Sequence, residues 1–429
     1  MSMKLIVVGA GVAGLVCART LLRSGIDVQV LEASDGVGGR VRSDHMDGFT
    51  LDRGFQVLFT AYPAAARQLD YRRLDLRRFD PGGVVCRAAT RQILSDPVRD
   101  PTSAIPSVFS RAVPFVDKIR TALLSVELLA QPLDKVLDVP EVSTETYLRR
   151  RGFSDAFLDN FIRPFFGAVF LNDNLETSAR AFRFDWRMLS QGNTVVPARG
   201  MGRISEQLAE ELTATNRIRL NTRVTALVRR SEDAAAPVDG VQLENGETLA
   251  ADMVVVATPA PEAARLTGCP MPIGNNGTTQ FYFAGEVSLY SGRKILLHAN
   301  QDAFVLTAIQ VTNVAPDYAP AGCHLFSASV LGVPAGDDAS LWARADADIR
   351  RMFAGDRKAL SAWETFRPLR LYRIPYGQFA QPPGVYDTLP DNESGIPGLI
   401  FAGEFTAASS FNAAMASGEK AAALLTGAG

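Results

Sequence analysis

The sequence predicts an α/β protein in which a domain with a parallel central sheet is joined to an α+β domain with a mixed sheet and a helical cover. Residues 4–31 read as a strand, a glycine-rich turn, a helix and a second strand, which is the building unit of a parallel sheet. Residues 252–259 and 400–402 are further short apolar runs of strand character. Residues 278–311 and 324–331 alternate polar and apolar side chains, which predicts the strands of a mixed sheet.

The glycine-rich turn has the residues of a dinucleotide site. Lys4 to Val8 is a buried strand, and Gly9, Gly11 and Gly14 follow it at G-x-G-x-x-G spacing. Gly9 allows the tight turn, Gly11 lets a pyrophosphate approach the backbone, and Gly14 lets the helix pack closely on the strand. Glu32 ends the second strand, where a carboxylate accepts ribose hydroxyls and repels a 2′-phosphate, so NADP is disfavoured. We expect the cofactor contacts of this Rossmann-like unit to come from Gly9, Gly11, Val12, Ala13, Gly14, Glu32 and Ala33.

The residues that follow indicate which dinucleotide is bound. Gly38, Gly39 and Arg40 come shortly after Glu32. This continuation resembles the flavoprotein superfamily that contains the flavin amine oxidases, protoporphyrinogen oxidases and phytoene desaturases. In that superfamily the arginine supports the FAD phosphates, so the resemblance implies FAD rather than NAD, with Gly39 and Arg40 among its contacts.

Two internal segments extend the resemblance. Residues 47–56 match a segment that passes beside the flavin ring, which implies that Gly54, Phe55 and Gln56 contact the ring. Without a Cβ, Gly54 lets the ring lie against the backbone, and an ordinary strand-to-loop glycine is the alternative. Val224 matches a valine whose backbone brackets the adenine.

The C-terminal stretch resembles the other half of the same cofactor site. Gly403 and Glu404 follow a short strand, and a helix is expected to begin near Asn412. The resemblance implies that Glu404 takes ribityl hydroxyls or reaches the pyrophosphate through water. It also implies that the helix N-terminus at Asn412 and Ala413 faces the flavin ring, with Phe411 beside it, although glycine is commoner than Ala413 at that position. The stretch holds no Cys or His, so non-covalent FAD is expected.

Residues 163–170, RPFFGAVF, resemble a turn of protoporphyrinogen-oxidase-like proteins and favour that branch and the carotenoid-desaturase-like one. The sequence leaves open whether these aromatic residues form core or cavity wall. Residues 102–137 have apolar side chains at helical spacing, interrupted by prolines. In the resembling enzymes such helices cover the substrate cavity and dip into a membrane surface. An amphipathic helix packed on its own domain is the alternative.

The chemistry expected from a flavin is hydride transfer from a substrate C–H or C–N unit. The first hypothesis is an FAD-dependent oxidoreductase that desaturates, oxidises or isomerises a lipophilic small molecule, isoprenoid or tetrapyrrole-like. Gln56, Tyr282 and Tyr376 are the candidates near the flavin, and the sequence singles out none as catalytic. An amine oxidase is the second hypothesis, weakened because residues 278–283 contain no lysine. A lipid-binding escort protein of the same fold, without flavin chemistry, is the third, and Glu32 argues against it.

Composition limits the partners and the setting. A net charge of −2 gives no general attraction to nucleic acid. The 4 cysteines are scattered, which favours a reducing compartment, and the 3 histidines have no metal-ligand spacing. No apolar run is long enough to cross a bilayer. We therefore expect a cytoplasmic protein with peripheral membrane contact at most; the pattern does not indicate the exact substrate, the electron acceptor or the oligomeric state.

The resemblance also predicts how the chain is divided. The FAD-binding domain is expected to contain residues 1–65, 190–260 and 385–429. The substrate domain is expected to contain residues 66–189 and 261–384.

Four further elements are predicted from local patterns. Residues 64–78 are expected to be helical, and a hairpin is expected to turn around residues 81–83. Residues 218–228 are expected to form one strand, and residues 338–354 a helix.

Overall fold

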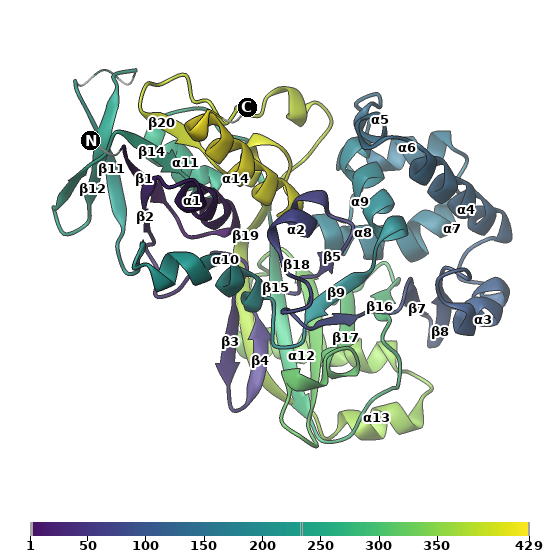
Figure 1. The fold of residues 1–429 in the computed structure, drawn as a ribbon. Coiled ribbons are helices and arrows are strands. Elements are labelled where there is room, and N and C mark those ends of the chain that lie inside the picture. Colours follow the sequence, from purple (N-terminus) through teal and green to yellow (C-terminus); the bar gives the residue numbers. More distant parts are fainter. Residues whose placement is uncertain (1–2, 232, 234, 428–429) are drawn as a thin grey trace.

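A five-stranded parallel sheet carries the N-terminal turn (Figure 1). The computed structural model describes residues 3–231, 233 and 235–427. Val7 pairs with Val30 on one side and with Val255 on the other, and all three are fully buried. Runs of buried β-branched residues are typical of parallel strands that are covered on both faces. In order across the sheet the strands are β10 (Ile218–Arg219), β2 (Asp27–Leu31), β1 (Lys4–Val8), β14 (Met253–Val256) and β20 (Leu399–Phe401).

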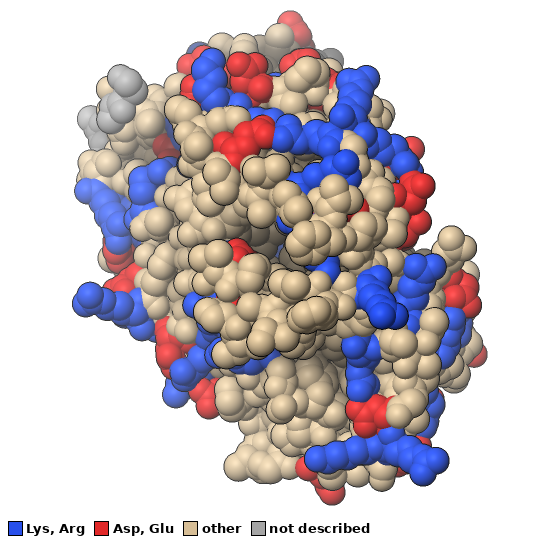
Figure 2. All heavy atoms as spheres, turned by 90° about the vertical axis from the view of Figure 1, so that its right-hand side faces the viewer, with Lys and Arg blue, Asp and Glu red and all other residues tan. Residues whose placement is uncertain are grey.

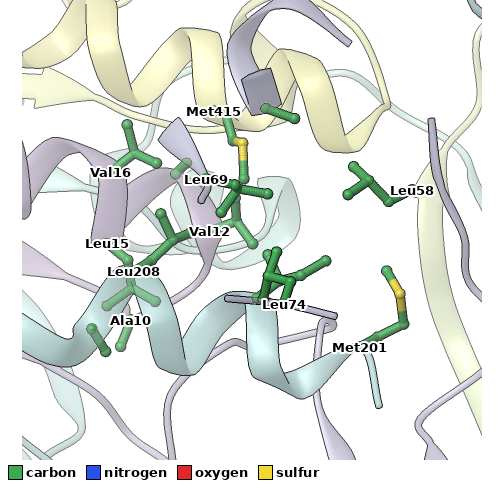
Figure 3. Packing of buried hydrophobic residues seen from close by; sticks show 14 of the residues in the cluster. Ala10, Val12, Leu15, Val16, Leu58, Leu69, Leu74, Met201, Leu208 and Met415 are labelled. Atoms are coloured by element: carbon green, nitrogen blue, oxygen red, sulfur yellow. The ribbon is translucent and has the colours of Figure 1, made fainter. Parts of the chain in front are cut away.

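The two ends of the chain meet beside this sheet. Helices α1 (Val12–Arg23), α10 (Gly202–Ala214) and α14 (Phe411–Thr426) contribute to one buried cluster. Figure 3 shows side chains from all three in that cluster, among them Leu15, Leu208 and Met415. At Gly418 of α14, an added Cβ would lie 2.4 Å from the carbonyl oxygen of Ala13 in α1. Only glycine allows this approach, which holds the last helix against the first.

A seven-stranded mixed sheet forms the lower half of the molecule in Figure 1. β15 is antiparallel to both of its neighbours, whereas β16 and β7 are parallel. Phe281, Phe283 and Phe326 of this sheet pack with side chains of α12 (Asp338–Met352) and α13 (Arg357–Trp363). In order the strands are β19 (Arg367–Phe379), β15 (Asn275–Gly285), β18 (His324–Leu331), β17 (Thr307–Gln310), β16 (Ile295–His298), β7 (Gly83–Arg87) and β8 (Thr90–Leu94).

A group of short helices covers one side of the molecule (right-hand side of Figure 1). Its core is aromatic: Phe166 packs against both Phe182 and Trp186. None of the described helices has the length and apolar character needed to cross a membrane. The helices are α3 (Ala104–Phe109), α4 (Phe115–Ala130), α5 (Leu133–Leu137), α6 (Thr144–Arg150), α7 (Asp155–Phe157), α8 (Arg163–Phe170) and α9 (Ala179–Gln191), with a π-helical turn at Leu158–Ile162.

Smaller elements connect these parts. Three small sheets are antiparallel throughout, and helices α2 (Pro63–Gln68) and α11 (Ala260–Thr267) lie between the larger units. The sheets are β11 (Val224–Arg229) with β12 (Val238–Leu243) and β13 (Thr248–Ala250), β3 (Ser43–Met46) with β4 (Phe49–Asp52), and β9 (Thr194–Pro197) between β5 (Leu58–Phe59) and β6 (Leu76–Arg78).

The predicted fold class is confirmed, but three predicted elements are wrong in detail. Residues 64–78 are not one helix, because α2 ends at Gln68 and residues 76–78 form β6. The Asp70 carboxylate accepts hydrogen bonds from the backbone N–H groups of Arg72 and Arg73, and this local turn competes with helix.

The other two errors concern turns in which residues other than glycine adopt positive φ angles. The hairpin of β7 and β8 turns at Ala88 and Ala89, with φ values of 46° and 59°, and not at residues 81–83. Residues 218–228 are divided between β10 and β11, which belong to different sheets, and Asn221 lies between them with φ 50°. No glycine or proline marks either turn in the sequence.

Candidate functional site

A cavity of about 1430 Å³ runs from the carboxyl ends of the parallel strands into the helical cover. Residues of the β1–α1 turn, of the segment after β2 and of the segment after β20 line one part of it. Residues of α4, α8 and α9 line the other part. Figure 2 looks onto the helical cover, where uncharged atoms surround a hollow and charged side chains gather towards the margins. The carboxyl edge of a parallel sheet is where ligands bind in such folds.

The β1–α1 turn offers backbone N–H groups to this cavity. Gly9 has φ 108°, and its N–H donates a hydrogen bond of 2.8 Å to the carbonyl oxygen of Leu31. This bond holds the turn against the end of β2. Gly11 caps α1 without a side-chain hydrogen bond, and no acidic residue lies in the first helical turn. A Cβ added at Gly11 would meet no atom within 4 Å, so the space beside it is open. Val12 and Ala13 also line the cavity, and an uncapped helix N-terminus of this kind binds anions such as phosphate.

Gly14, unlike Gly9 and Gly11, has a packing role outside the cavity wall. It does not appear among the residues lining the cavity, and an added Cβ would lie 2.1 Å from the carbonyl oxygen of Gly9. Its role is therefore the close packing of helix on turn, as the sequence predicts.

Glu32 lies at the end of β2 with its carboxylate held in place. Its two oxygens accept hydrogen bonds from the backbone N–H groups of Ala10 (2.8 Å) and Ser34 (2.9 Å) and from the Ser34 hydroxyl (2.7 Å). A carboxylate has about four acceptor positions, so capacity remains for a ribose hydroxyl. Ala33 and Val224 line the same part of the cavity.

An orphaned hydroxyl lies near the same edge of the sheet. Thr258 follows β14 and lines the cavity, and its buried Oγ1 has no hydrogen-bond partner among the described residues. Buried polar atoms are rarely left unpaired in native proteins, so this atom fits a site completed by a ligand or by water.

Arg40 and Glu404 join the front of the chain to its end. Their side chains form an ion pair at 2.5 Å, and Arg40 also donates to the carbonyl oxygen of Gly377 at 2.8 Å. Burial lowers the pKa of Arg40, but attraction to Glu404 outweighs it and the net shift is upward. Gly39 and Gly403 line the cavity beside the pair. Gly39, Arg40, Gly403 and Glu404 therefore all border the same cavity.

The segment predicted to contact a flavin ring lies in the middle of the cavity wall. Gly54, Phe55 and Gln56 all line the cavity. Gly54 has φ 92°, and an added Cβ would lie 2.8 Å from Cδ1 of Ile374. The Gln56 amide donates to the carbonyl oxygen of Arg40 at 2.7 Å, which orients the side chain. The Phe55 N–H donates to Oε1 of Gln280 at 3.2 Å.

At the start of α14, where the resemblance implies that Asn412 and Ala413 face the flavin ring, two polar groups already have partners within the protein. The Ser410 hydroxyl accepts a hydrogen bond from the Ala413 N–H at 3.1 Å, so that donor is already paired. The Asn412 side chain accepts from the Ala64 N–H at 2.9 Å and anchors α2. Phe411 and Ser410 line the cavity, whereas Asn412 and Ala413 are not among its lining residues.

Of the three ring candidates, only Gln56 lines the cavity. Tyr282 is 2% exposed, and its hydroxyl donates to the carbonyl oxygen of Asp52 at 2.9 Å. Tyr376 lies under Arg40, whose guanidinium is 5.4 Å from the ring centroid. Its buried hydroxyl has no hydrogen-bond partner within the described part of the chain.

The far part of the cavity is an aromatic chamber that contains one buried carboxyl group. Phe165 and Phe166, which the sequence left open as core or wall, belong to both the aromatic core and the cavity wall. Asp185 on α9 also lines this chamber and is 6% exposed. Sequence reasoning missed it, because an aspartate within FRFDWRM reads as the solvated face of an amphipathic helix.

The comparisons with known proteins identify the family. The profile of the flavin containing amine oxidoreductase family matches residues 12–426. The chain belongs to this family. The members of the family are flavoproteins, in agreement with the nucleotide-type geometry of the cavity.

Individual relatives differ in what they act on. The chain is 25% identical over 339 residues to a coproporphyrinogen III oxidase of Propionibacterium freudenreichii subsp. freudenreichii, covering 65% of this chain and 61% of that protein. It is 28% identical over 267 residues to polyamine oxidase 2 of Arabidopsis thaliana, covering 60% of this chain and 51% of that protein. The matches thus span less than two thirds of these relatives.

A solved structure shows the same fold over the whole length. An oxidoreductase from Methanosarcina mazei superposes with a TM-score of 0.70 at 18% identity, covering 97% of this chain and 99% of that one. The coverage indicates that the cofactor-type sheet and the mixed sheet occur together in both proteins.

Proposed function

We propose that this protein is an oxidoreductase that binds FAD non-covalently and takes a hydride from a lipophilic small molecule. One observation carries the proposal: a single cavity connects an uncapped helix N-terminus and a ribose-type glutamate to an aromatic chamber. When bound, the flavin would supply the hydride acceptor. Family membership supports a flavin, and the acidic end of β2 favours FAD over a nucleotide with a 2′-phosphate.

The residues of this chain have distinct roles in the proposal. The N–H groups at the start of α1, beside Gly11, would hold the pyrophosphate, and Glu32 would hold the ribose. The Arg40–Glu404 ion pair fixes two charged side chains in the middle of the cavity. The aromatic chamber would bind the apolar substrate and keep water away from the reacting atoms.

An amine oxidase is a less well supported alternative. Thr278 lines the cavity on β15, where the resembling amine oxidases carry a lysine, and its hydroxyl donates to the carbonyl oxygen of Val330 at 2.9 Å. Lys118 is the only lysine among the lining residues, and it donates to the carbonyl oxygens of Val108 and Ser110 at the cavity mouth. Most of the chamber wall is aromatic or aliphatic, which favours a substrate such as an isoprenoid or a tetrapyrrole-like molecule.

The cavity mouth suggests how such a substrate arrives. Phe115, Ile119 and Val126 of α4 line the cavity and are also 61%, 48% and 65% exposed, and nearby Phe109 is 78% exposed. Large exposed apolar side chains grouped at an opening are typical of a surface that meets another apolar phase. We propose that this mouth touches the surface of a lipid bilayer, from the cytoplasmic side, so that the substrate passes directly from lipid to cavity.

Anaerobic bleaching of the bound flavin tests the function. The purified protein should be yellow, and porphyrinogens and carotenoid precursors should reduce its flavin faster than polyamines do. A yellow protein that only amines reduce would favour the alternative. A colourless protein that still binds lipid would instead favour an escort role.

A further inference from the structure

Asp185 is a buried carboxyl group with one of its oxygens unengaged. The Tyr62 hydroxyl donates to Oδ1 at 3.3 Å. No other hydrogen bond and no ion pair of Asp185 is present within residues 3–231, 233 and 235–427. The side chain is 6% exposed and borders the cavity, so Oδ2 has access to the cavity and to no protein donor.

The surroundings of Asp185 are aromatic on both sides. Tyr62 stacks on Phe184 with ring centroids 6.0 Å apart, and Trp186 stacks on Phe166 at 5.7 Å. Burial raises the pKa of Asp185 to about 7, although the hydrogen bond from Tyr62 lowers it. An unpaired carboxyl group in such a wall costs free energy, and a substrate that pairs with it recovers that cost.

The position of Asp185 relates it to the expected reaction centre. Tyr62 directly precedes α2, and the Ala64 N–H in α2 is bonded to Asn412 at the start of α14. Burial and the charge of Asp185 both raise the pKa of Tyr386, whose hydroxyl donates to Gln381 at 3.1 Å. Gln381 in turn accepts the N–H of Ser409, a residue that lines the cavity beside Glu404. The residues around Asp185 are therefore connected to Asn412 and Ser409, which belong to the cofactor end of the molecule.

We propose that Asp185 is a specificity-determining residue that accepts a hydrogen bond from an N–H or O–H group of the substrate. The substrate is then a largely apolar molecule with such a donor, and a pure hydrocarbon is discriminated against because it leaves the carboxyl group unpaired. This inference rests on the proposed function and narrows its substrate class. The aromatic wall supplies most of the binding free energy, and Asp185 determines which apolar molecules are preferred.

Indole and indene test the inference, because the two molecules have nearly the same shape and only indole has an N–H. Their affinities for the flavin-containing protein are measured by calorimetry at pH 8. The wild type should bind indole about tenfold or more tightly than indene, as expected for one hydrogen bond to a charged acceptor. In Asp185→Leu the ratio should fall to about one, and Asp185→Asn should keep part of the preference through its amide oxygen.

Two controls keep the outcome clear. Asp138→Leu changes an aspartate of the same helical region whose side chain is 75% exposed, and it should leave the ratio unchanged. In the wild type the preference should decline below pH 7, because protonation removes the charged acceptor. Tyr62 and Tyr386, which face the carboxyl group, have raised pKa values and do not titrate in that range. This pH profile needs no variant, so it holds even where Asp185→Leu does not fold.

The results separate the inference from the proposed function. A yellow wild type without preference for indole, or a yellow Asp185→Leu variant that keeps the full preference, would overturn the role of Asp185 alone. A colourless wild type would overturn the oxidoreductase proposal, and the indole-to-indene ratio would still report on the carboxyl group.

Discussion

The same methyl group should have very different effects on stability at Gly11 and at Gly418. At Gly418 an added Cβ would lie 2.4 Å from a backbone oxygen and 3.0 Å from Cβ of Val16, so α1 and α14 must separate. Overpacking of this kind costs about 1–3 kcal/mol of unfolding free energy. At Gly11 the backbone has φ −71°, and the new methyl group meets nothing within 4 Å. Gly11→Ala should therefore change the stability of the flavin-free protein by less than about 1 kcal/mol, because the gain through the unfolded chain is offset by the poorer N-cap that alanine makes.

For FAD affinity, the larger direct effect should come from Gly11→Ala and not from Gly418→Ala. In Gly11→Ala the methyl group fills the space through which a phosphate reaches the start of α1, and loss of even one such hydrogen bond weakens binding about tenfold. In Gly418→Ala any loss of affinity should accompany the loss of stability. Urea unfolding of the flavin-free proteins and titration with FAD measure the two quantities. A Gly11→Ala variant that binds FAD like the wild type would refute the phosphate site, and an undiminished stability of Gly418→Ala would refute the close packing.

Three further predictions follow from buried and exposed groups elsewhere. Because burial raises the folded-state pKa of Asp185 to about 7, the native protein binds its proton more tightly than the unfolded chain, and stability from this group is lost as pH rises from about 4 to 7. Between pH 4 and 7, the unfolding free energy of Asp185→Asn relative to the wild type should therefore increase by about 1.4 kcal/mol per pH unit. Parallel pH profiles of the two proteins in urea unfolding would contradict this. Phe109→Asp should reduce co-sedimentation with phosphatidylcholine vesicles, whereas Val287→Asp, at a 47% exposed position away from the mouth, should not; equal effects would remove the bilayer from the proposal. Lys294→Met should lower the unfolding free energy by about 1.5–3 kcal/mol, because Asp100 loses its charged partner but keeps hydrogen bonds from Ser95, Thr102 and Ser103, and a loss under 1 kcal/mol in urea unfolding would show that the pair is dispensable.

The bounds of some strands could be predicted from the sequence to the residue. β1 and β18 have the predicted bounds, because β1 is a short run of apolar strand formers and β18 alternates polar and apolar residues. β6 could not be found in this way. It has only three residues, and what makes it a strand is pairing with β9, which lies more than a hundred residues further along the chain.

The cofactor end of the site was predictable for a similar reason, since the glycines and Glu32 act through local backbone geometry. The substrate end was not. Tyr282 was a candidate because it lies on the predicted strand. It shares a face of β15 with Thr278, which lines the cavity, but the sequence does not show how far along that face the cavity extends. The Tyr282 hydroxyl is bonded to Asp52, whereas the neighbouring Gln280 reaches Phe55. Asp185 depends on α2 and α9 meeting in space, and a single sequence carries no sign of that contact.

The flavin content of the purified protein tests the central claim most directly. The claim is that the turn after β1 and the segment after β20 hold one FAD between them without a covalent bond. Acid precipitation should release equimolar FAD from the wild type into the supernatant, and Glu32→Ala should release far less while it remains folded by circular dichroism. Wild-type protein without flavin, flavin that stays with the precipitate, or an unchanged yield from Glu32→Ala would contradict the account.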